Sequence, residues 1–262
     1  MRLQGKKIIV TGGAGGIGGG VVRCYVREGA TVAIVDINDE AGRTLEVQAN
    51  ELAAGGGSAK FWHLDVSKAD EVFAGFDEII ADMGGVDVLA HLAAVDFIQL
   101  PPELWTVEQM HKFWENNLDA TVLTNQAVYK HFKETKQGVI INYASDTGIS
   151  GSPFQGPYAM SKAGVLAWTR TLAMTWARES NVRVNSVCPQ IMTPMYEHYI
   201  ASLDDQAREA FLSTWAQMYP LYGKPGDPDK DAGPVMVFLA SEDSRYINGQ
   251  IIAINGGAEI TR

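Results

Sequence analysis

A run of glycines between a buried strand and a helix constrains this chain more than any other feature. Lys7–Thr11 is largely apolar, which is typical of a parallel strand buried on both faces. Gly12 to Gly18 follows and contains only two residues that are not glycine, and a helical pattern then spans Val21–Arg27. Glycines let a pyrophosphate approach the backbone, and a helix N-terminus offers free N–H groups. The order strand, glycine-rich turn, helix therefore predicts a phosphate-binding turn.

Strand-like and helix-like segments alternate along the rest of the chain. The expected strands are Lys7–Thr11, Thr31–Val35, Lys60–Leu64, Val86–Ala90, Val139–Tyr143, Val182–Val187 and Gln250–Ile254. The expected helices are Val21–Arg27, Asp39–Ala53, Lys68–Asp82, Thr106–Glu134, with a kink near Asn116 and Asn117, and Tyr158–Glu179. This alternation predicts an α/β fold with a single doubly wound parallel sheet of the Rossmann-like type and helices on both faces. We expect one domain spanning residues 1–262, with ligands outside the carboxyl ends of the strands.

An acidic residue ends the second expected strand. Asp36 follows the apolar run Thr31–Val35, about 20 residues beyond the glycines, where a carboxylate can accept both hydroxyls of an adenine ribose. A 2′-phosphate would be repelled there, and neither Gly12 to Gly20 nor the pair Ile37 and Asn38 supplies a cation to receive it. The pattern favours NAD over NADP as the cofactor.

The segment Tyr158–Lys162 carries the strongest chemical signal. A tyrosine and a lysine four residues apart on a helix project from the same face, and Ser145 precedes them at the end of an apolar strand-like run. We expect the Lys162 ammonium to lower the pKa of the phenol from about 10, so that Tyr158 can exchange a proton with an alcohol or carbonyl near neutral pH. Tyr129 and Lys133 share the spacing, but no strand-end serine precedes them, so we interpret Tyr129 as structural.

Composition narrows the possible partners and the compartment. A net charge of −10 and a pI near 4.9 argue against nucleic acid and anionic membranes as partners, because both require basic patches. Cys24 and Cys188 lie in apolar contexts without metal-ligand neighbours, so we expect no metal site and a reducing compartment. With no signal-like segment and no apolar run of membrane-spanning length, we expect a cytoplasmic protein.

Taken together, these motifs resemble the short-chain dehydrogenase/reductase family over essentially the whole chain. The matching features, in order, are Thr11-Gly-x-x-x-Gly-Ile-Gly18, Asp65-Val66, Asn117, Ser145 and Tyr158-x-x-x-Lys162. The resemblance implies that Tyr158 is the acid/base and that Ser145 binds the substrate oxygen. It also implies that Lys162 lowers the tyrosine pKa and holds the nicotinamide ribose, and that Asn117 holds a proton-relaying water.

The resemblance also implies a set of residues that contact the cofactor from its pyrophosphate to its carboxamide. These residues are Gly12, Gly16, Ile17, Gly18, Asp36, Asp65, Val66, Ala93, Tyr158, Lys162, Ile191 and Thr193. Two positions depart from the family pattern. His91 stands where an asparagine usually steadies the sheet, and Gln190 stands where a glycine usually follows Pro189.

We therefore expect an NAD-dependent oxidoreductase that transfers a hydride between nicotinamide and a secondary alcohol or ketone. Two alternatives are an NAD-sensing regulator without turnover and a dehalogenase-type lyase on the same fold. The intact Asn117, Ser145, Tyr158 and Lys162 set argues against the first, and the glycine run with Lys162 argues against the second.

Substrate and assembly are the least determined features. Residues expected to line the substrate pocket are Asp96, Phe97, Asp146, Gln155, Gln190, Met192, Met195, Tyr196, Trp215, Met218 and Tyr222. Their aromatic and methionine content suggests a medium-sized, partly apolar or cyclic small molecule. We expect residues 193–222 to form one or two short helices that act as a lid, and helices Thr106–Glu134 and Tyr158–Glu179 to form the interfaces of a homotetramer.

Overall fold

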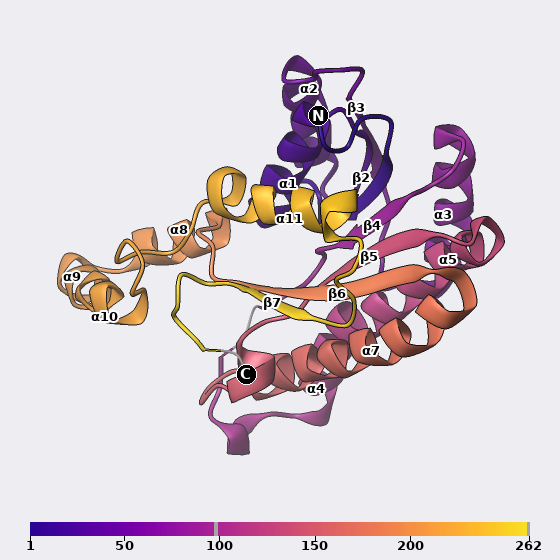
Figure 1. The fold of residues 1–262 in the computed structure, drawn as a ribbon. Helices are drawn as coiled ribbons and strands as arrows, with labels where there is room; N and C mark the ends of the chain where they lie inside the picture. Colours follow the sequence, from indigo (N-terminus) through magenta and orange to yellow (C-terminus); the bar gives the residue numbers. More distant parts are fainter. Residues whose placement is uncertain (97–98, 261–262) are drawn as a thin grey trace.

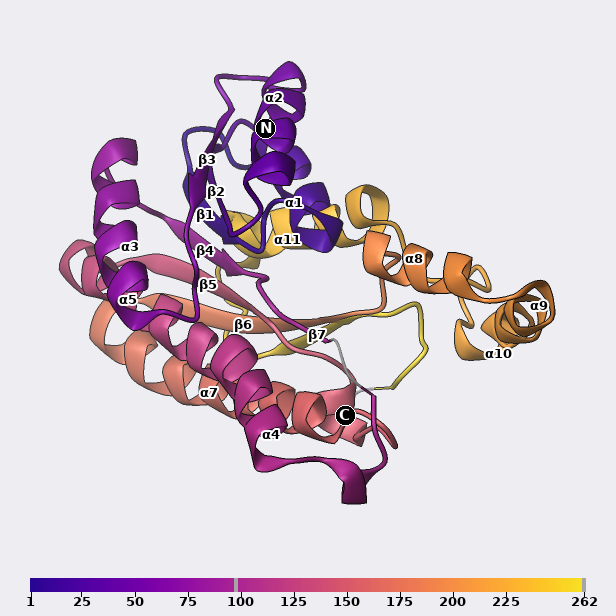
Figure 2. The same cartoon turned by 180° about the vertical axis from the view of Figure 1, so that it is seen from behind.

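The computed structural model describes residues 1–96 and 99–260, and Figures 1 and 2 show it from opposite sides. Within these residues, seven strands form one parallel sheet in the order β3-β2-β1-β4-β5-β6-β7. The strands are β1 (Lys7–Thr11), β2 (Thr31–Asp36), β3 (Ser58–His63), β4 (Val88–His91), β5 (Gly138–Tyr143), β6 (Val182–Pro189) and β7 (Ile251–Ile254). The strand order reverses between β1 and β4, which confirms the predicted doubly wound sheet and places its ligand-binding crevice beside β1.

Helices cover both faces of the sheet (Figure 1). One face carries α1 (Gly16–Arg27), α2 (Asp39–Glu51) and α11 (Gly233–Ala240), and the other carries α3 (Ala69–Met83), α5 (Ala120–Thr135) and α7 (Gly156–Ser180). The shorter helical elements are η1 (Pro102–Leu104), α4 (Val107–Phe113), η2 (Trp114–Asp119), α6 (Thr147–Ser150), α8 (Pro194–Ser202), α9 (Asp205–Ser213), α10 (Trp215–Met218), η3 (Pro228–Ala232) and η4 (Glu242–Ser244). In the described part of the chain, no helix combines the length and apolar character needed to cross a bilayer.

The two core layers explain why the central strands are continuous apolar runs. Successive side chains of β1 point to opposite faces, so Ile8 and Val10 enter the core beneath α1 and α11, whereas Ile9 enters the core beneath α3, α5 and α7. All three side chains are fully buried, and burial of one such side chain contributes about 1.5–3 kcal/mol. A polar residue on either face would interrupt a core, so the site begins only where these strands end.

The helix expected over 106–134 is divided by the π-helical turn η2. Thr106 and Gln109 form a capping box that starts α4, and η2 then replaces the α-helical turn at the predicted kink. Thr121 Oγ1 donates to the Asn117 carbonyl at 2.6 Å, and Asn116 Nδ2 donates to the Lys112 carbonyl at 2.8 Å. The asparagine pair therefore marks a local change of helix geometry, and Asn117 is buried by it.

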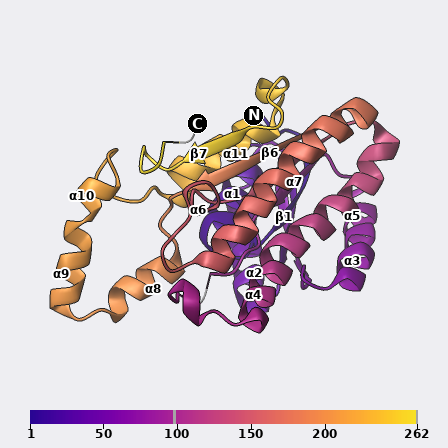
Figure 3. The ribbon, with the colours of Figure 1, turned by 90° about the horizontal axis from the view of Figure 1, so that it is seen from below.

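The segment after β6 forms three short helices, α8, α9 and α10, rather than the one or two that were expected. They extend beyond the edge of the sheet and away from the main body (Figure 3). Tyr196 of α8 stacks on Trp215 of α10 with ring centroids 6.2 Å apart, and Phe211 of α9 packs edge-on to both rings. The segment thus holds itself together through its own aromatic side chains.

Candidate active site

The glycine-rich turn after β1 leaves no room for side chains on its inner side. A Cβ on Gly12, whose φ is +63°, would lie 2.7 Å from the backbone of Ala93, and a Cβ on Gly18 would lie 2.0 Å from the Gly12 carbonyl oxygen. By contrast, a Cβ on Gly15 would meet nothing within 4 Å. The turn is therefore closed toward the sheet and open toward the start of α1, as a cradle for a phosphate group requires.

Asp36 lies beside this turn, at the end of β2. Its Oδ2 accepts the Ala14 backbone N–H at 3.1 Å, and its Oδ1 accepts the Asn38 backbone N–H at 3.0 Å. Each oxygen keeps a further lone pair, so the carboxylate can still accept ligand hydroxyls. The structure thus brings Asp36 to the glycine turn, the arrangement that a ribose-binding carboxylate needs.

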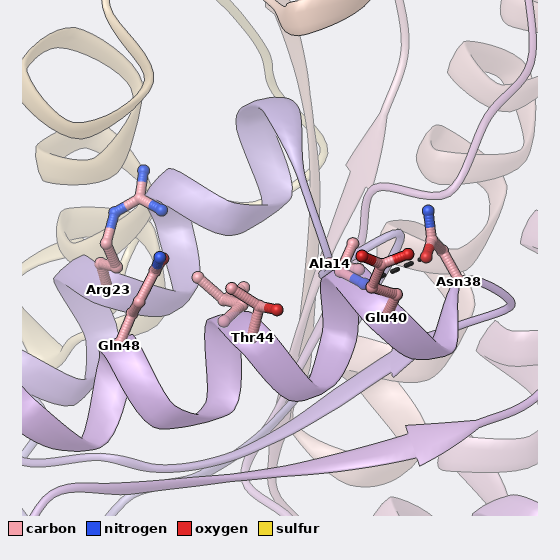
Figure 4. A pocket seen from close by; sticks show the side chains of 8 residues that line it. Ala14, Arg23, Asn38, Glu40, Thr44 and Gln48 are labelled. Carbon is pink, nitrogen blue, oxygen red and sulfur yellow. Dashed lines mark hydrogen bonds between the residues drawn. The ribbon is translucent and has the colours of Figure 1, made fainter.

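A cavity of about 410 Å³ opens between α1 and α2 (Figure 4), and its lining includes Ala14 and Asn38, whose backbone N–H groups donate to Asp36. Its lining residues are Ala14, Arg23, Asn38, Glu40, Ala41, Thr44, Leu45 and Gln48. Arg23 is the only cation among these described residues, and sequence reasoning missed it because it lies one turn beyond the glycines. Its guanidinium makes a bidentate ion pair with Asp229, and Glu40 adds a negative charge to the cavity. Among the described residues, the cavity therefore holds one cation that is already paired and one unpaired carboxylate.

The residues expected at the adenine follow β3. Asp65 Oδ1 accepts the Ser67 backbone N–H at 2.9 Å and its hydroxyl at 2.7 Å. Burial alone would raise the pKa of Asp65, but these hydrogen bonds outweigh it and lower the pKa. Val66 packs partly against the core beneath α3. The Asp65 carboxylate thus shapes its own loop and positions Val66 at the carboxyl edge.

The other predicted cofactor contacts lie where the segment after β6 approaches the glycine turn. A Cβ on Gly16 would lie 3.6 Å from Cγ2 of Thr193, which shows how closely the two segments approach. Thr193 Oγ1 caps α8 by accepting the Tyr196 N–H at 3.3 Å, and Ile191 is buried beside Gly226. Ile17 occupies the first turn of α1, partly buried against the core. The segment after β6 therefore lies against the glycine turn at the start of α1.

Ser145 and Tyr158 meet at the end of β5. Ser145 Oγ accepts the Thr147 backbone N–H at 3.2 Å and the Thr147 hydroxyl at 3.0 Å, so its own proton is free to be donated. A hydrogen bond from Ser145 reaches Tyr158, whose side chain is only 6% exposed in the first turn of α7. The strand end and the helix start thus hold two hydroxyl groups together, as the sequence predicted.

Lys162 does not act on Tyr158 in the expected way. Its Nζ donates to the Tyr143 carbonyl at 3.0 Å and lies 5.5 Å from the Tyr158 ring centroid. The pKa of Tyr158 lies well above its usual 10. Burial is the largest cause, and the charge and hydrogen bond of Tyr143 come next, whereas an ammonium partner would lower this pKa. Burial also lowers the pKa of Lys162 to about 7. The expected depression of the tyrosine pKa is therefore wrong for this structure, because desolvation of the buried phenol dominates.

Tyr143 is a site residue that sequence reasoning missed. It is the last residue of β5, and its hydroxyl accepts a hydrogen bond from Tyr158. The Lys162 Nζ lies 4.2 Å from the Tyr143 ring centroid, within cation–π distance. The only sequence signal was its position two residues before Ser145, where it was counted as a strand residue.

Asn117 uses its side chain to hold the loop after β4. Its Oδ1 accepts the Val95 N–H at 2.8 Å, and its Nδ2 donates to the Val95 carbonyl at 3.0 Å and to Ser161 Oγ at 3.4 Å. These bonds make the side chain a clamp on the loop after β4, and the water-holding role implied for Asn117 stays a prediction.

The predicted substrate residues fall into separate groups. Gln155 Nε2 donates to Asp96 Oδ2 at 2.6 Å, and the side chain of Gln190 hydrogen-bonds to Asp146. Burial raises the pKa of both carboxyl groups. Met195 is 62% exposed on α8, and Tyr196 belongs to the aromatic cluster of α8–α10.

The remaining predicted pocket residues lie on or beside the three short helices. Met218 and Tyr222 are exposed, whereas Trp215 packs against Tyr196 and Tyr219. Met192 donates its backbone N–H to the Gly226 carbonyl at 2.8 Å. Phe97 lies outside the described residues. Among residues 1–96 and 99–260, no three His, Cys, Asp or Glu side chains are arranged to hold a metal ion.

Comparison with known proteins agrees with this geometry. A family model described as enoyl-(acyl carrier protein) reductase matches residues 12–259. The 3-oxoacyl-(acyl-carrier-protein) reductase FabG of Thermotoga maritima is 36% identical over 268 residues, with 99% of this chain and 100% of the relative covered. The chain belongs to the short-chain dehydrogenase/reductase family. It is therefore an oxidoreductase on a nicotinamide-binding fold.

Other members of the family show how far its substrates range. The 2,5-dichloro-2,5-cyclohexadiene-1,4-diol dehydrogenase of Sphingobium indicum is 32% identical over 257 residues, with 97% of each chain covered. The structure of an NAD⁺-bound xylitol dehydrogenase superposes with a TM-score of 0.88 at 26% identity, covering 98% of this chain and 100% of the other. Acyl-thioester, cyclic diol and polyol enzymes thus share this fold.

The two departures from the family pattern have structural partners. His91 Nδ1 lies 2.8 Å from Thr11 Oγ1 and 3.0 Å from Thr124 Oγ1, so the ring joins β4 to β1 and α5. Burial lowers the pKa of His91 to about 3, which keeps the ring neutral. The side chain of Gln190 hydrogen-bonds to the Asp146 carboxyl group. Tyr129, the rival tyrosine, donates to Glu179 at 2.8 Å and stacks on Trp176, so its contacts are structural.

Proposed function

We propose that this protein is an NAD-dependent dehydrogenase or carbonyl reductase acting on a secondary alcohol or ketone. The observation that carries the proposal is the meeting of two sets of groups at one edge of the sheet. The open glycine turn with Asp36 lies on one side, and Ser145, Tyr158 and Lys162 lie on the other. The first set fits a dinucleotide and the second fits the oxygen of an alcohol.

The residues present fit NAD better than NADP. The cradle accepts a pyrophosphate because only glycine fits its closed side, and Asp36 offers lone pairs to ribose hydroxyls. A 2′-phosphate carries a charge of about −2 and would meet Asp36 and Glu40. Arg23 is the one cation that lines the cavity among the described residues, and its ion pair with Asp229 already offsets its charge. The residues that would hold the cofactor are Gly12, Gly16, Ile17, Gly18, Asp36, Asp65, Val66, Ala93, Ile191 and Thr193, together with Tyr158 and Lys162.

The chain's hydroxyl groups position and protonate the substrate oxygen. When bound, the nicotinamide supplies hydride acceptance or donation at the carbinol carbon. Ser145 donates to Tyr158 in the structure and would turn this proton to the substrate oxygen, because its acceptor sites are filled by Thr147. Tyr158 gives its proton to a carbonyl oxygen during reduction, and takes the hydroxyl proton during oxidation. The raised pKa of Tyr158 favours the protonated phenol that reduction needs.

Lys162 and Asn117 serve the proton balance of this step. With a pKa of about 7, the Lys162 amine can gain and lose a proton near neutral pH. Its hydrogen bond to the Tyr143 carbonyl keeps it at the end of β5. Asn117 would hold the water that relays protons between Lys162 and solvent. Asn117, Ser145, Tyr158 and Lys162 are thus proposed as the catalytic set.

The carboxyl groups near Tyr158 favour a neutral substrate. Asp96 and Asp146 each keep one buried oxygen without a hydrogen-bond partner among the described residues. An anionic substrate group would be repelled by both carboxyl groups, whereas a neutral substrate would not be. A medium-sized, partly apolar or cyclic alcohol therefore suits this side of the site, and Gln155, Gln190, Met195 and Tyr196 complete the proposed substrate residues.

A panel of secondary alcohols and ketones tests the proposal. NADH absorbance would report turnover with NAD, and the same panel with NADP is the matched control. We expect turnover of at least one cyclic secondary alcohol with NAD. Tight binding of NAD without turnover of any alcohol or ketone would contradict the enzyme assignment and favour a sensor.

We also propose a cytoplasmic homotetramer assembled through α4, α5 and α7. Met160 and Met174 of α7 are more than half exposed, although Trp168 and Trp176 pack partly within the chain. Cys24 and Cys188 are both buried and unpaired, which suits a reducing compartment. Light scattering should give four times the 28.4 kDa chain mass, and a monomer would refute the assembly.

A further inference from the structure

Asp96, in the loop after β4, has one satisfied and one unsatisfied carboxylate oxygen. Its Oδ2 accepts a 2.6 Å hydrogen bond from Gln155 Nε2. Its Oδ1 is buried and has no hydrogen-bond partner among residues 1–96 and 99–260. A buried oxygen without a donor is costly, so a site of this kind is built for a group that arrives with a donor.

Two elements of the active site hold this carboxylate in place. Asn117 grips both backbone groups of Val95, the neighbouring residue, at 2.8 and 3.0 Å. Gln155 is the residue that precedes α7, three positions before Tyr158, and its Oε1 accepts the Ser152 hydroxyl at 2.9 Å. Asp96 is therefore positioned relative to Tyr158 by the same helix that carries the tyrosine.

Asp96 also lies within electrostatic range of the reacting groups. Its charge raises the pKa of both Tyr158 and Tyr143. Lys162 is the cation that interacts with Asp96, and its positive charge opposes the rise that burial causes in the pKa of Asp96. Because an opposite charge is already nearby, what Oδ1 lacks is a hydrogen-bond donor and not a further cation.

We infer that Asp96, held by Gln155, binds a second hydroxyl group of the substrate close to the carbon that reacts at Tyr158. The substrate class is then a diol or polyol and not a simple secondary alcohol. The inference rests on the proposed function, because it places this hydroxyl beside an alcohol oxidised at Tyr158. Asp96 is a specificity-determining residue in this scheme, and Tyr158 keeps its acid/base role.

The expected gain in kcat/KM from the second hydroxyl follows from the charge of the Asp96 carboxylate that accepts it. A hydroxyl that donates to a buried carboxylate should improve kcat/KM by roughly 10- to 100-fold over an analogue without it. A mono-alcohol leaves Oδ1 unpaired and is penalised, whereas its own hydroxyl still reaches Ser145 and Tyr158. Discrimination between the two substrates therefore reports on Asp96 alone.

The experiment compares vicinal cyclohexanediol with cyclohexanol in the full-length enzyme with NAD. The wild type should prefer the diol by roughly 10-fold or more in kcat/KM. In Asp96→Ala, and to a smaller extent in Asp96→Asn, the ratio of kcat/KM for the diol to kcat/KM for cyclohexanol should fall toward one. Asp77→Ala is the matched control and should behave as wild type. It removes an exposed carboxylate of α3 that pairs with Lys130 of α5.

Three outcomes separate the inference from the proposed function. Equal use of diol and mono-alcohol by the wild type would overturn the inference and leave the dehydrogenase assignment standing. An equal loss for both alcohols in Asp96→Asn, with NAD binding unchanged, would also overturn it, because Asp96 would then support the site as a whole. Absence of turnover with every alcohol would contradict the proposed function itself, and the inference would fall with it.

Discussion

The cofactor side and the substrate side of the site are held in place by different kinds of hydrogen bond, from the backbone on the first side and from a side chain on the second. Asp36 receives two backbone N–H groups, from Ala14 and Asn38, so its position follows from the path of the chain. Asp96 receives one side-chain amide, from Gln155 in a distant segment, and one of its oxygens stays unpaired. Backbone contacts survive most side-chain changes, whereas side-chain contacts do not. Relatives with diverse substrates can therefore share the first side while they differ on the second.

The largest expected effect lies between the two sides, at Tyr158. Tyr158→Phe removes the acid/base and should reduce kcat by about 10² to 10⁴, because a positioned proton donor contributes that much. NAD binding should stay nearly intact, since Asp36 and the glycine turn are unchanged. Stopped-flow or steady-state NADH formation, with NAD titrated by fluorescence, measures both quantities.

Tyr129→Phe is the matched control for this change. Tyr129 has the same spacing to a lysine, but its hydroxyl contacts Glu179 and Ser180 and no group of the site. Its replacement should leave kcat nearly unchanged. If Tyr158→Phe kept a tenth of the wild-type rate, the acid/base assignment would have to be abandoned.

The next largest effect concerns the cofactor side alone. Wild type should prefer NAD over NADP by about 10²-fold or more in kcat/KM. The reason is that the Asp36 carboxylate would face the 2′-phosphate of NADP, and two like charges a few ångströms apart near a surface repel each other by several kcal/mol. Asp36→Ala should weaken NAD and admit NADP, so that the preference falls. Its effect on the ratio of kcat/KM between diol and mono-alcohol should be small, because Asp96 lies on the other side.

Asp229→Asn sharpens the same test by a different route. The change weakens the ion pair that engages Arg23, so the guanidinium becomes available to the cavity beside Asp36. NADP use should rise in Asp36→Ala/Asp229→Asn above that in Asp36→Ala. If the double variant used NADP no better than Asp36→Ala, Arg23 would have no part in cofactor choice.

The smallest expected effect is a pH dependence of stability caused by Lys162. Its pKa is lowered from 10.5 to about 7 in the folded protein, so the unfolded chain binds more protons between these values. The free energy of unfolding should therefore rise with pH from about 7 toward 9, before the buried tyrosines begin to titrate in the unfolded chain. Thermal unfolding of the cofactor-free protein should show this slope, and Lys162→Met should remove it. Parallel pH profiles for the two proteins would show that Lys162 is protonated in the fold.

Much of the fold could be predicted because its signals are local. A buried parallel strand is a short apolar run, and its glycine turn and helix follow directly in the sequence, as β1 and α1 do. The kink at Asn117 was also visible, because two polar residues interrupt an apolar helix face. The three helices after β6 were less clear, since aromatic residues such as Tyr196 and Trp215 pack on one another and give no clean period.

The parts of the site that could not be predicted depend on distant partners. Spacing placed Tyr158 and Lys162 on one helix face, but only the fold shows that Lys162 binds the Tyr143 carbonyl and that burial governs both pKa values. Arg23 joins the cavity beside Asp36 only because α1 packs against α2, and its pairing with Asp229 spans most of the chain. Such contacts have no signature in a local pattern.

The most direct test of the account is transfer of a labelled hydride. An alcohol that carries deuterium on its carbinol carbon is incubated with the enzyme and NAD, and the reduced cofactor is analysed by mass spectrometry. The account predicts that one deuterium passes to the nicotinamide ring, and that Tyr158→Phe slows this transfer without changing its destination. Loss of the label to solvent, or reduced cofactor without label, would contradict hydride transfer at this site.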